Sequence, residues 1–243
     1  MHHLHLHNKP TVVLVHGAFA DSSSWNGVVK KLKDEGYPLV AAANPLRGLS
    51  SDAAYLKDVL AGIDGPIVLV GHSYGGSVIS EAANGADNVK ALVYIAAFLP
   101  EQGESAATLA DMFPGSTLGD VLHQAPITLA DGSKETDLYI QQDKFHEQFA
   151  ADVPENTTAI MAVTQRPVTN SALAEEASEP AWKTIPSWVL VAKQDRNIPA
   201  QTQHFMAERA KAQVVEVDAS HAVSVSHPEE VAEVIEQAAR ATH

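Results

Sequence analysis

The chain of 243 residues is 45% hydrophobic, which is enough to bury a sizeable core, and α/β chains of this length commonly fold as one domain. Its net charge of −14, from 16 basic and 30 acidic residues, argues against nucleic acid and anionic membranes as partners. Because the chain contains no cysteine, disulfides, thiolate catalysis and cysteine-bound metals are excluded.

The N-terminal region carries no secretory signal, and no apolar run approaches the roughly 18 residues of a membrane-spanning helix, so we expect a cytoplasmic protein. Residues 1–7 alternate histidine with leucine and could form a metal-binding edge strand. A disordered arm or an expression tag is the more frequent meaning of such a segment, and we favour it. We expect no metal and no organic cofactor, and the oligomeric state is not indicated.

Short apolar runs alternate with amphipathic segments along the chain. Apolar runs predict strands at residues 11–15, 38–43, 67–70, 91–97, 187–192 and 214–217. The uninterrupted run 67–70 is expected to be buried on both faces, and the strand at 187–192 is also expected to be buried. Strands that alternate with helices at this spacing favour a mostly parallel, doubly wound sheet. Such sheets bind ligands at the carboxyl ends of their strands, where Gly17, Ser73 and Phe98 fall.

The helices are predicted from apolar residues three and four positions apart. Asp21 or Ser22 can begin a helix that buries Trp25, Val28 and Leu32. We expect further helices at 77–83 and 200–210, and one that begins at Ser51 and buries Tyr55, Leu56, Val59, Leu60 and Ile63. Ser226-His227-Pro228-Glu229 has the pattern of a capping box before the last helix, with His227 exposed.

The pattern weakens between residues 100 and 182, which we interpret as a cap inserted into a core formed by residues 1–99 and 183–243. We expect a hairpin around 127–133 and short helices at 143–151 and 155–165. The cap contributes many apolar side chains, so a largely apolar pocket is expected. Which of them line it cannot be read from spacing.

The stretch Gly71-His72-Ser73-Tyr74-Gly75 joins a buried strand to a helix. A tight strand-to-helix corner leaves no room for side chains two positions before and after its central residue, which is itself strained and exposed. The glycines therefore make Ser73 a candidate nucleophile. The helix that follows would direct amides and its positive dipole end at a developing oxyanion.

A serine nucleophile needs a base, and the base needs an acid that orients it. Asp195 follows the strand at 187–192, and His221 follows the strand at 214–217. The order Ser73, Asp195, His221 is the one expected on a doubly wound sheet. Asp218 is an alternative acid, although we expect it to shape the loop before His221.

The chain resembles the α/β-hydrolase superfamily from Thr11 to Ala239, except for the cap. The resemblance is carried by the Gly71–Gly75 corner, the His16-Gly17 turn, the Asp195 loop with its Ile198-Pro199 pair, and His221. The resemblance implies an α/β-hydrolase fold. It also implies an oxyanion hole made by the amides of Ala18 and Tyr74, with Phe19 as the fallback for Ala18.

Within that superfamily, His16-Gly17-Ala18 followed by Trp25 is most similar to small esterases related to plant methylesterases and hydroxynitrile lyases, and to bacterial hydrolases. The lyases have a threonine where Gly17 stands and a lysine where Ala222 stands, so the lyase activity is disfavoured. Epoxide hydrolases and haloalkane dehalogenases need an aspartate at the position of Ser73.

Other polar residues have simpler explanations. We expect His72 to be buried and bonded to backbone, His16 to be a structural turn residue, and Arg47 and Arg166 to bind loop carbonyls rather than an anion. Phe19 and Trp182 are candidate substrate-binding residues, although Trp182 can equally be core. The acidic pair Glu175-Glu176 is expected to be a solvated helix start.

The sequence therefore predicts a serine esterase that cleaves small, largely apolar carboxylic esters through an acyl-enzyme. Two alternatives remain open. One is a protein that binds or signals with a small ligand and keeps a slow or vestigial triad. The other is cofactor-free perhydrolysis, in which peroxide replaces water at the acyl-enzyme.

Overall fold

The computed structural model describes residues 9–242, so the histidine-rich segment 1–7 lies outside the described residues. A six-stranded sheet with the order β2-β1-β3-β4-β8-β9 forms the centre of the molecule, and every adjacent pair of strands is parallel. The predicted α/β-hydrolase sheet is confirmed. Its strands are β1 (Thr11–Val15), β2 (Leu39–Ala42), β3 (Ile67–His72), β4 (Val89–Ile95), β8 (Ser187–Ala192) and β9 (Gln213–Val217).

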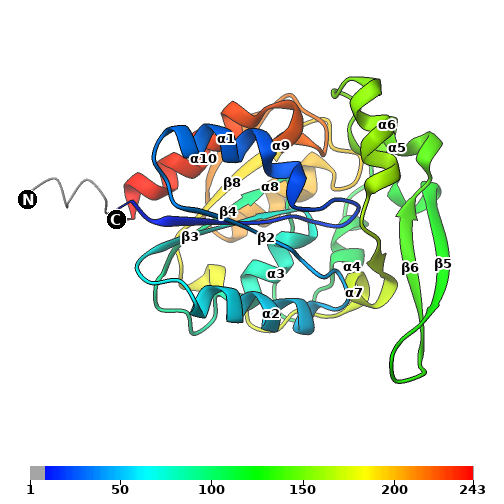
Figure 1. The fold of residues 1–243 in the computed structure, drawn as a ribbon, viewed down its shortest axis with the longest axis horizontal. Helices are drawn as coiled ribbons and strands as arrows, with labels where there is room; N and C mark the ends of the chain where they lie inside the picture. The colour runs from blue at the N-terminus through cyan, green and yellow to red at the C-terminus, as the bar shows by residue number, and fades with distance from the viewer. Residues whose placement is uncertain (1–8, 243) are drawn as a thin grey trace, which may run out of the picture.

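Helices cover both faces of this sheet, as Figure 1 shows. One face carries α1 (Asn26–Asp34), α9 (Val223–Ser226) and α10 (Pro228–Ala241), and the other carries α2 (Leu49–Ala61), α3 (Tyr74–Ala82) and α8 (Ala200–Arg209). Successive residues of β1 alternate between the two cores: Val12 and Leu14 pack under α1 and α10, whereas Val13 and Val15 pack under α2 and α3. Burial on both faces explains why β1 and the first four residues of β3 are almost entirely apolar, whereas the edge strand β9 is largely exposed and carries Gln213 and Glu216.

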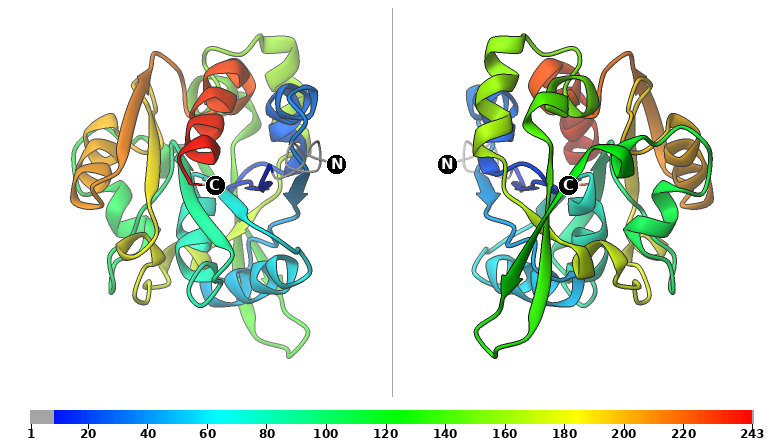
Figure 2. Two further views of the ribbon diagram at one scale, coloured as in Figure 1. Left: turned by 90° about the vertical axis from the view of Figure 1, so that its left-hand side faces the viewer. Right: turned by 90° about the vertical axis from the view of Figure 1, so that its right-hand side faces the viewer.

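The segment 100–182 lies across the carboxyl ends of the strands, to the right in Figure 1. Its hairpin is longer than expected, with β5 (Leu122–Thr128) and β6 (Lys134–Ile140) paired along their full length, and it extends beyond the layer of α2 and α3 (Figure 2). The predicted helices appear as α5 (Gln142–Phe149) and α6 (Glu155–Thr164). The remaining elements are α4 (Ala106–Ala110), η3 (Leu118–Val121), β7 (Val168–Thr169), α7 (Asn170–Ala174) and η4 (Ala181–Lys183).

The beginnings of several helices differ from the prediction. Helix α3 begins at Tyr74, directly after Ser73, rather than at Ser77. Helix α2 begins at Leu49 rather than Ser51. The Leu49 amide donates to Glu175 Oε1 (2.7 Å), and the Ser50 amide donates to Glu175 Oε2 (3.1 Å). Glu175 is therefore not the solvated helix start that was expected. Tyr55, placed in the buried stripe of α2 by its spacing, is 46% exposed.

The predicted capping box before α10 is also wrong. His227 is the N-cap residue, but its side chain makes no capping hydrogen bond, because the Ser226 hydroxyl holds its Nδ1 at 2.9 Å. Asp152 lies 3.6 Å from the same nitrogen, so His227 is only partly exposed. At the other end of the chain, Asp21 confirms its predicted capping role, because its side chain accepts from the Ser23 amide at the start of η2 (Ser22–Trp25).

No helix within residues 9–242 is long and apolar enough to cross a membrane.

Candidate active site

Ser73 lies at the corner between β3 and α3 in a strained backbone conformation, with φ 56° and ψ −124°. The two glycines around it are required by close backbone contacts. A Cβ on Gly71 would lie 2.6 Å from the Gly75 carbonyl oxygen, and a Cβ on Gly75 would lie 2.4 Å from the Val15 oxygen. No side chain fits at these distances, so the backbone geometry that presents Ser73 depends on glycine at both positions.

The turn after β1 packs directly against this corner. A Cβ on Gly17 would lie 2.7 Å from the His72 oxygen and 3.3 Å from the Tyr74 nitrogen. The Tyr74 amide belongs to the first residue of α3, where N–H groups have no partner within the helix. The Phe19 amide already donates to the Arg166 carbonyl (3.0 Å), whereas no residue between 9 and 242 accepts from the Ala18 amide. The arrangement leaves Ala18, rather than Phe19, available beside Tyr74.

His16 holds the turn in place. Its Nδ1 donates to the Gly17 carbonyl (2.9 Å), and its Nε2 accepts from the Asn44 amide (3.0 Å). Burial lowers the pKa of His16 below its ordinary value, which agrees with a neutral ring that donates at one nitrogen and accepts at the other. His16 is therefore a structural turn residue.

His221 and Asp195 form a buried pair on two neighbouring loops. His221 Nδ1 lies 2.7 Å from Asp195 Oδ2, and neither side chain is exposed to solvent. The amides of Asn197 (2.8 Å) and Ile198 (2.9 Å) donate to Asp195 Oδ1, and Gln203 Nε2 donates to Oδ2 (3.1 Å). Because every one of these partners is a donor, the carboxylate is held in one orientation with Oδ2 directed at the histidine.

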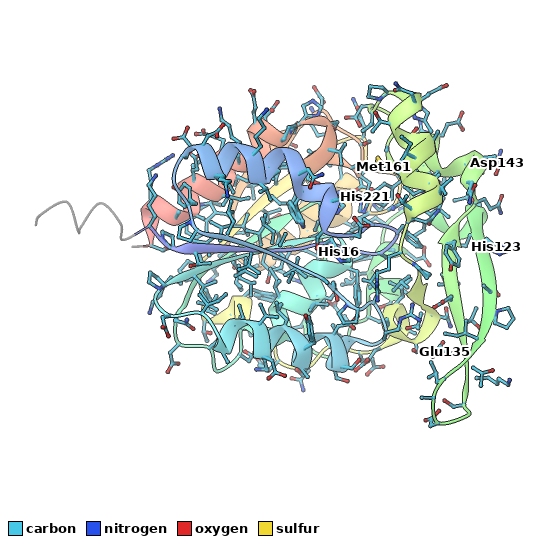
Figure 3. The ribbon with its side chains drawn as sticks, viewed as in Figure 1. His16, His123, Glu135, Asp143, Met161 and His221 are labelled. Atoms are coloured by element: carbon cyan, nitrogen blue, oxygen red, sulfur yellow. The ribbon has the colours of Figure 1, made fainter. Side chains whose placement is uncertain are left out.

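The second ring nitrogen of His221 is buried and has no hydrogen-bond partner among the described residues. With Nδ1 donating to Asp195, Nε2 carries the lone pair that a base requires. Figure 3 shows His221 and His16 toward the same end of the sheet, the end that the segment 100–182 covers. Asp218, the alternative acid, points away: its side chain is 72% exposed and lies 3.4 Å from Lys193 Nζ.

His72, directly before the candidate nucleophile, contacts His221. Its Nε2 donates to the His221 carbonyl (2.7 Å), and the two rings lie 4.6 Å apart between centroids. Burial and the neighbouring His221 keep the pKa of His72 well below its ordinary value. These contacts connect the loop that carries His221 to the residue next to Ser73.

A narrow pocket of about 50 Å³ opens at Ser73. Its other lining residues come from the core and from the segment 100–182, and none is charged: Ala18, Phe19, Tyr74, Phe98, Ala106, Ala107, Ala110, Leu118, Leu173, Asn197 and Ile198. Trp182 does not line this pocket, because its indole N–H donates to the Pro100 carbonyl (3.0 Å) inside the fold. Asn197 was not anticipated from the sequence, because nothing in its neighbourhood marks it as facing a pocket.

Arg47 and Arg166 bind loop carbonyls, as expected, but Arg47 also forms an ion pair with Asp137 (2.7 Å), which was not expected. Arg166 Nε donates to Pro45 (3.2 Å), and Arg47 donates to Leu46 (3.1 Å) and Pro167 (2.9 Å). Within the described part of the chain, no group of three or more histidine, aspartate and glutamate side chains is arranged to hold a metal ion.

The model of the alpha/beta hydrolase family matches residues 12–234. The chain is 28% identical to the alpha/beta hydrolase nvfD of Aspergillus novofumigatus over 95% of its own length and 97% of that protein. It is 27% identical to a pyrethroid hydrolase of Sphingobium wenxiniae over 92% of its length and 85% of that protein.

Solved structures show the same fold. The crystal structure of polyneuridine aldehyde esterase superposes with a TM-score of 0.81 at 18% identity, covering 94% of this chain and 98% of the esterase. The resemblance predicted from the Gly71–Gly75 corner and the His16-Gly17 turn is confirmed. The chain belongs to the alpha/beta hydrolase family.

Proposed function

We propose that this carboxylic ester hydrolase works through a triad of Ser73, His221 and Asp195. The buried pair of His221 and Asp195 is the observation that carries the proposal, because it leaves a histidine nitrogen unpartnered and oriented by a fixed carboxylate. His72 supports the third member, since it contacts His221 and is bonded covalently to Ser73. A base oriented in this way beside a strained serine is the arrangement that activates a hydroxyl nucleophile.

The chemistry follows from these positions. Ser73 Oγ attacks the ester carbonyl while His221 Nε2 takes the hydroxyl proton, and Asp195 stabilises the imidazolium that forms. The amides of Ala18 and Tyr74 donate to the oxyanion of the tetrahedral intermediate. His221 then protonates the departing alkoxide, and water, activated by the same nitrogen, releases the acid from Ser73.

The substrate that suits this site is a small, largely apolar ester. The pocket at Ser73 holds about 50 Å³ and has no charged lining residue, so a charged group would lose hydration there without gaining an ionic partner. The names of the relatives agree with ester chemistry, since they include a pyrethroid hydrolase, a carbendazim hydrolyzing esterase of Nocardioides sp. and plant methylesterases.

The proposal is tested first by Ser73→Ala, assayed with short p-nitrophenyl esters. We expect an unchanged thermal unfolding midpoint and a loss of nearly all turnover, with a residual acceleration on the order of 10³ over water from binding and the oxyanion hole. Full turnover in Ser73→Ala would exclude the assignment of the nucleophile.

The acid is tested by a matched pair of variants at Asp195 and Asp218. Asp195→Asn removes the acceptor that holds the tautomer of His221, so kcat should fall by about 10³ to 10⁴. Asp218→Asn should leave kcat unchanged, because this side chain is 72% exposed and bonded to Lys193. The opposite ranking of the two variants would identify Asp218 as the acid.

A further inference from the structure

Asn197 is the one lining residue of the pocket at Ser73 whose side chain ends in an amide, and it is 3% exposed. Its own polar atoms are almost all used inside the protein. The backbone amide donates to Asp195 Oδ1 (2.8 Å), and the backbone carbonyl accepts from the Ser116 hydroxyl (2.8 Å). The side-chain oxygen accepts from Gln148 Nε2 (2.8 Å). Only Nδ2 has no partner among the described residues.

The orientation of this amide is determined by residues of the segment 100–182. The Thr117 hydroxyl donates a hydrogen bond to Gln148 Oε1 (2.8 Å). This bond determines which end of the Gln148 amide is the oxygen and which is the nitrogen. Gln148 Nε2 therefore faces both the Arg196 carbonyl (3.0 Å) and Asn197 Oδ1. This chain of donors fixes Oδ1 of Asn197 on the protein side, so Nδ2 is the side-chain atom that remains for a ligand.

A donor that faces a pocket is satisfied by water until a ligand displaces it, and a bound ligand that offers no acceptor leaves the donor unpaired at a cost in free energy. The rest of the pocket is apolar apart from Ser73 and the backbone, so the donor is the feature that can distinguish one ester from another of the same shape. Because no lining residue is cationic, the matching acceptor is uncharged: an ether, ketone or hydroxyl oxygen rather than a carboxylate.

We propose that Asn197 determines specificity by donating a hydrogen bond from Nδ2 to an uncharged acceptor oxygen of the ester substrate, close to the scissile carbonyl. The inference rests on the proposed function, since it assumes that the substrate enters the pocket at Ser73. It assigns a substrate class to the enzyme: short esters that carry one additional ether, ketone or hydroxyl oxygen. A purely hydrocarbon ester would leave Nδ2 unsatisfied.

Two pairs of esters of equal shape test the proposal. On the acyl side, p-nitrophenyl methoxyacetate is compared with p-nitrophenyl butyrate, and on the alcohol side, 2-methoxyethyl acetate with butyl acetate. The quantity measured is the ratio of kcat/KM for the ether to kcat/KM for the hydrocarbon ester. Intrinsic reactivity cancels when this ratio is compared between wild type and variant, as in a double-mutant cycle.

In Asn197→Leu, the side chain keeps its size but loses the donor, and we expect the ratio to fall about fivefold in at least one pair, as for one neutral hydrogen bond. Asn197→Asp is the second variant, because it keeps the acceptor for Gln148 while replacing the donor by an oxygen; the same ratio should fall further. Ile198→Val is the matched control, since it changes the pocket wall without changing a donor, and its ratio should stay at the wild-type value.

A second measurement does not depend on turnover. NMR titration gives the dissociation constants of the same esters for Ser73→Ala and for Ser73→Ala/Asn197→Leu. A ratio that is unchanged by Asn197→Leu and by Asn197→Asp, in turnover and in binding, overturns the role of Asn197 and leaves the esterase proposal intact. Turnover that persists in Ser73→Ala overturns the proposed function instead, and the binding ratio then decides on Asn197 by itself.

Discussion

Two buried histidines of the candidate site differ in what their nitrogens contact. His221 has one nitrogen on Asp195 and the other unpartnered, which suits a group that exchanges a proton. His72 donates to the His221 carbonyl and is packed against the His221 ring, so a second positive charge there would be repelled by a protonated His221. The fold therefore keeps His72 neutral.

This difference predicts a pH dependence of stability. Burial depresses the pKa of His72 in the folded state below its ordinary 6.5, whereas the unfolded chain binds the proton at that value. The stability contributed by the neutral ring is present above pH 6.5 and is lost as the pH falls below it. Between neutral pH and pH 5, the free energy of unfolding should fall by as much as about 2 kcal/mol from this residue.

Chemical denaturation at pH 7.5 and 5.0 checks the effect. His72→Gln removes the titrating ring, so the difference in the free energy of unfolding between the two pH values should be smaller in this variant than in wild type. His123→Gln is the control, because His123 is exposed on β5 and far from the core. Equal pH dependence of wild type and His72→Gln would show that His72 binds its proton alike in both states.

At the scale of elements, local sequence predicted the strands better than the helix ends. A strand that is buried on both faces is marked by the apolar run of its own residues. Strand β8 accordingly has the predicted bounds, Ser187–Ala192. Helix α2 begins at the point where the Glu175 carboxylate accepts from the Leu49 amide. The two residues are 126 positions apart, so the sequence around the helix start does not reveal this contact. The same reason hid Asn197: the orientation of its amide depends on Gln148 and Thr117, in a segment whose sequence pattern is weak.

Glu175 should therefore stabilise α2 as an N-terminal cap from outside the helix. Glu175→Ala leaves the Leu49 and Ser50 amides without an acceptor and removes a negative charge from the helix N-terminus, so the free energy of unfolding should fall by about 1 kcal/mol. Glu176→Ala is the matched control, since Glu176 is exposed and next in sequence. Urea denaturation gives the free energy of unfolding of both variants. Equal losses in the two variants would mean that the negative charge of the region stabilises the helix and that the capping contact of Glu175 does not.

At the scale of the whole molecule, one attachment of the segment 100–182 to the core is the chain around β7. Thr169 donates its amide to Leu46 (3.1 Å) and its hydroxyl to the Arg47 carbonyl (3.0 Å). The Arg47 guanidinium bonds Pro167 and lies 2.7 Å from Asp137 Oδ1 on β6. Since the same segment supplies part of the pocket at Ser73 and the residues that orient Asn197, this attachment helps to position those residues.

Arg47→Met should weaken the attachment, because it leaves Asp137, which is 8% exposed, without its cationic partner. Arg47 itself is one-third exposed, so solvent screening limits the expected loss to roughly 1–2 kcal/mol in the free energy of unfolding. In a double-mutant cycle, Asp137→Leu should cost less in the Arg47→Met background than in wild type, because the unpaired carboxylate is then removed. Urea denaturation gives the four free energies, and hydrogen exchange of the β5 and β6 amides shows whether the loss is local to the hairpin. Additive effects would mean that Arg47 stabilises the attachment through its carbonyl contacts alone, with no contribution from the ion pair.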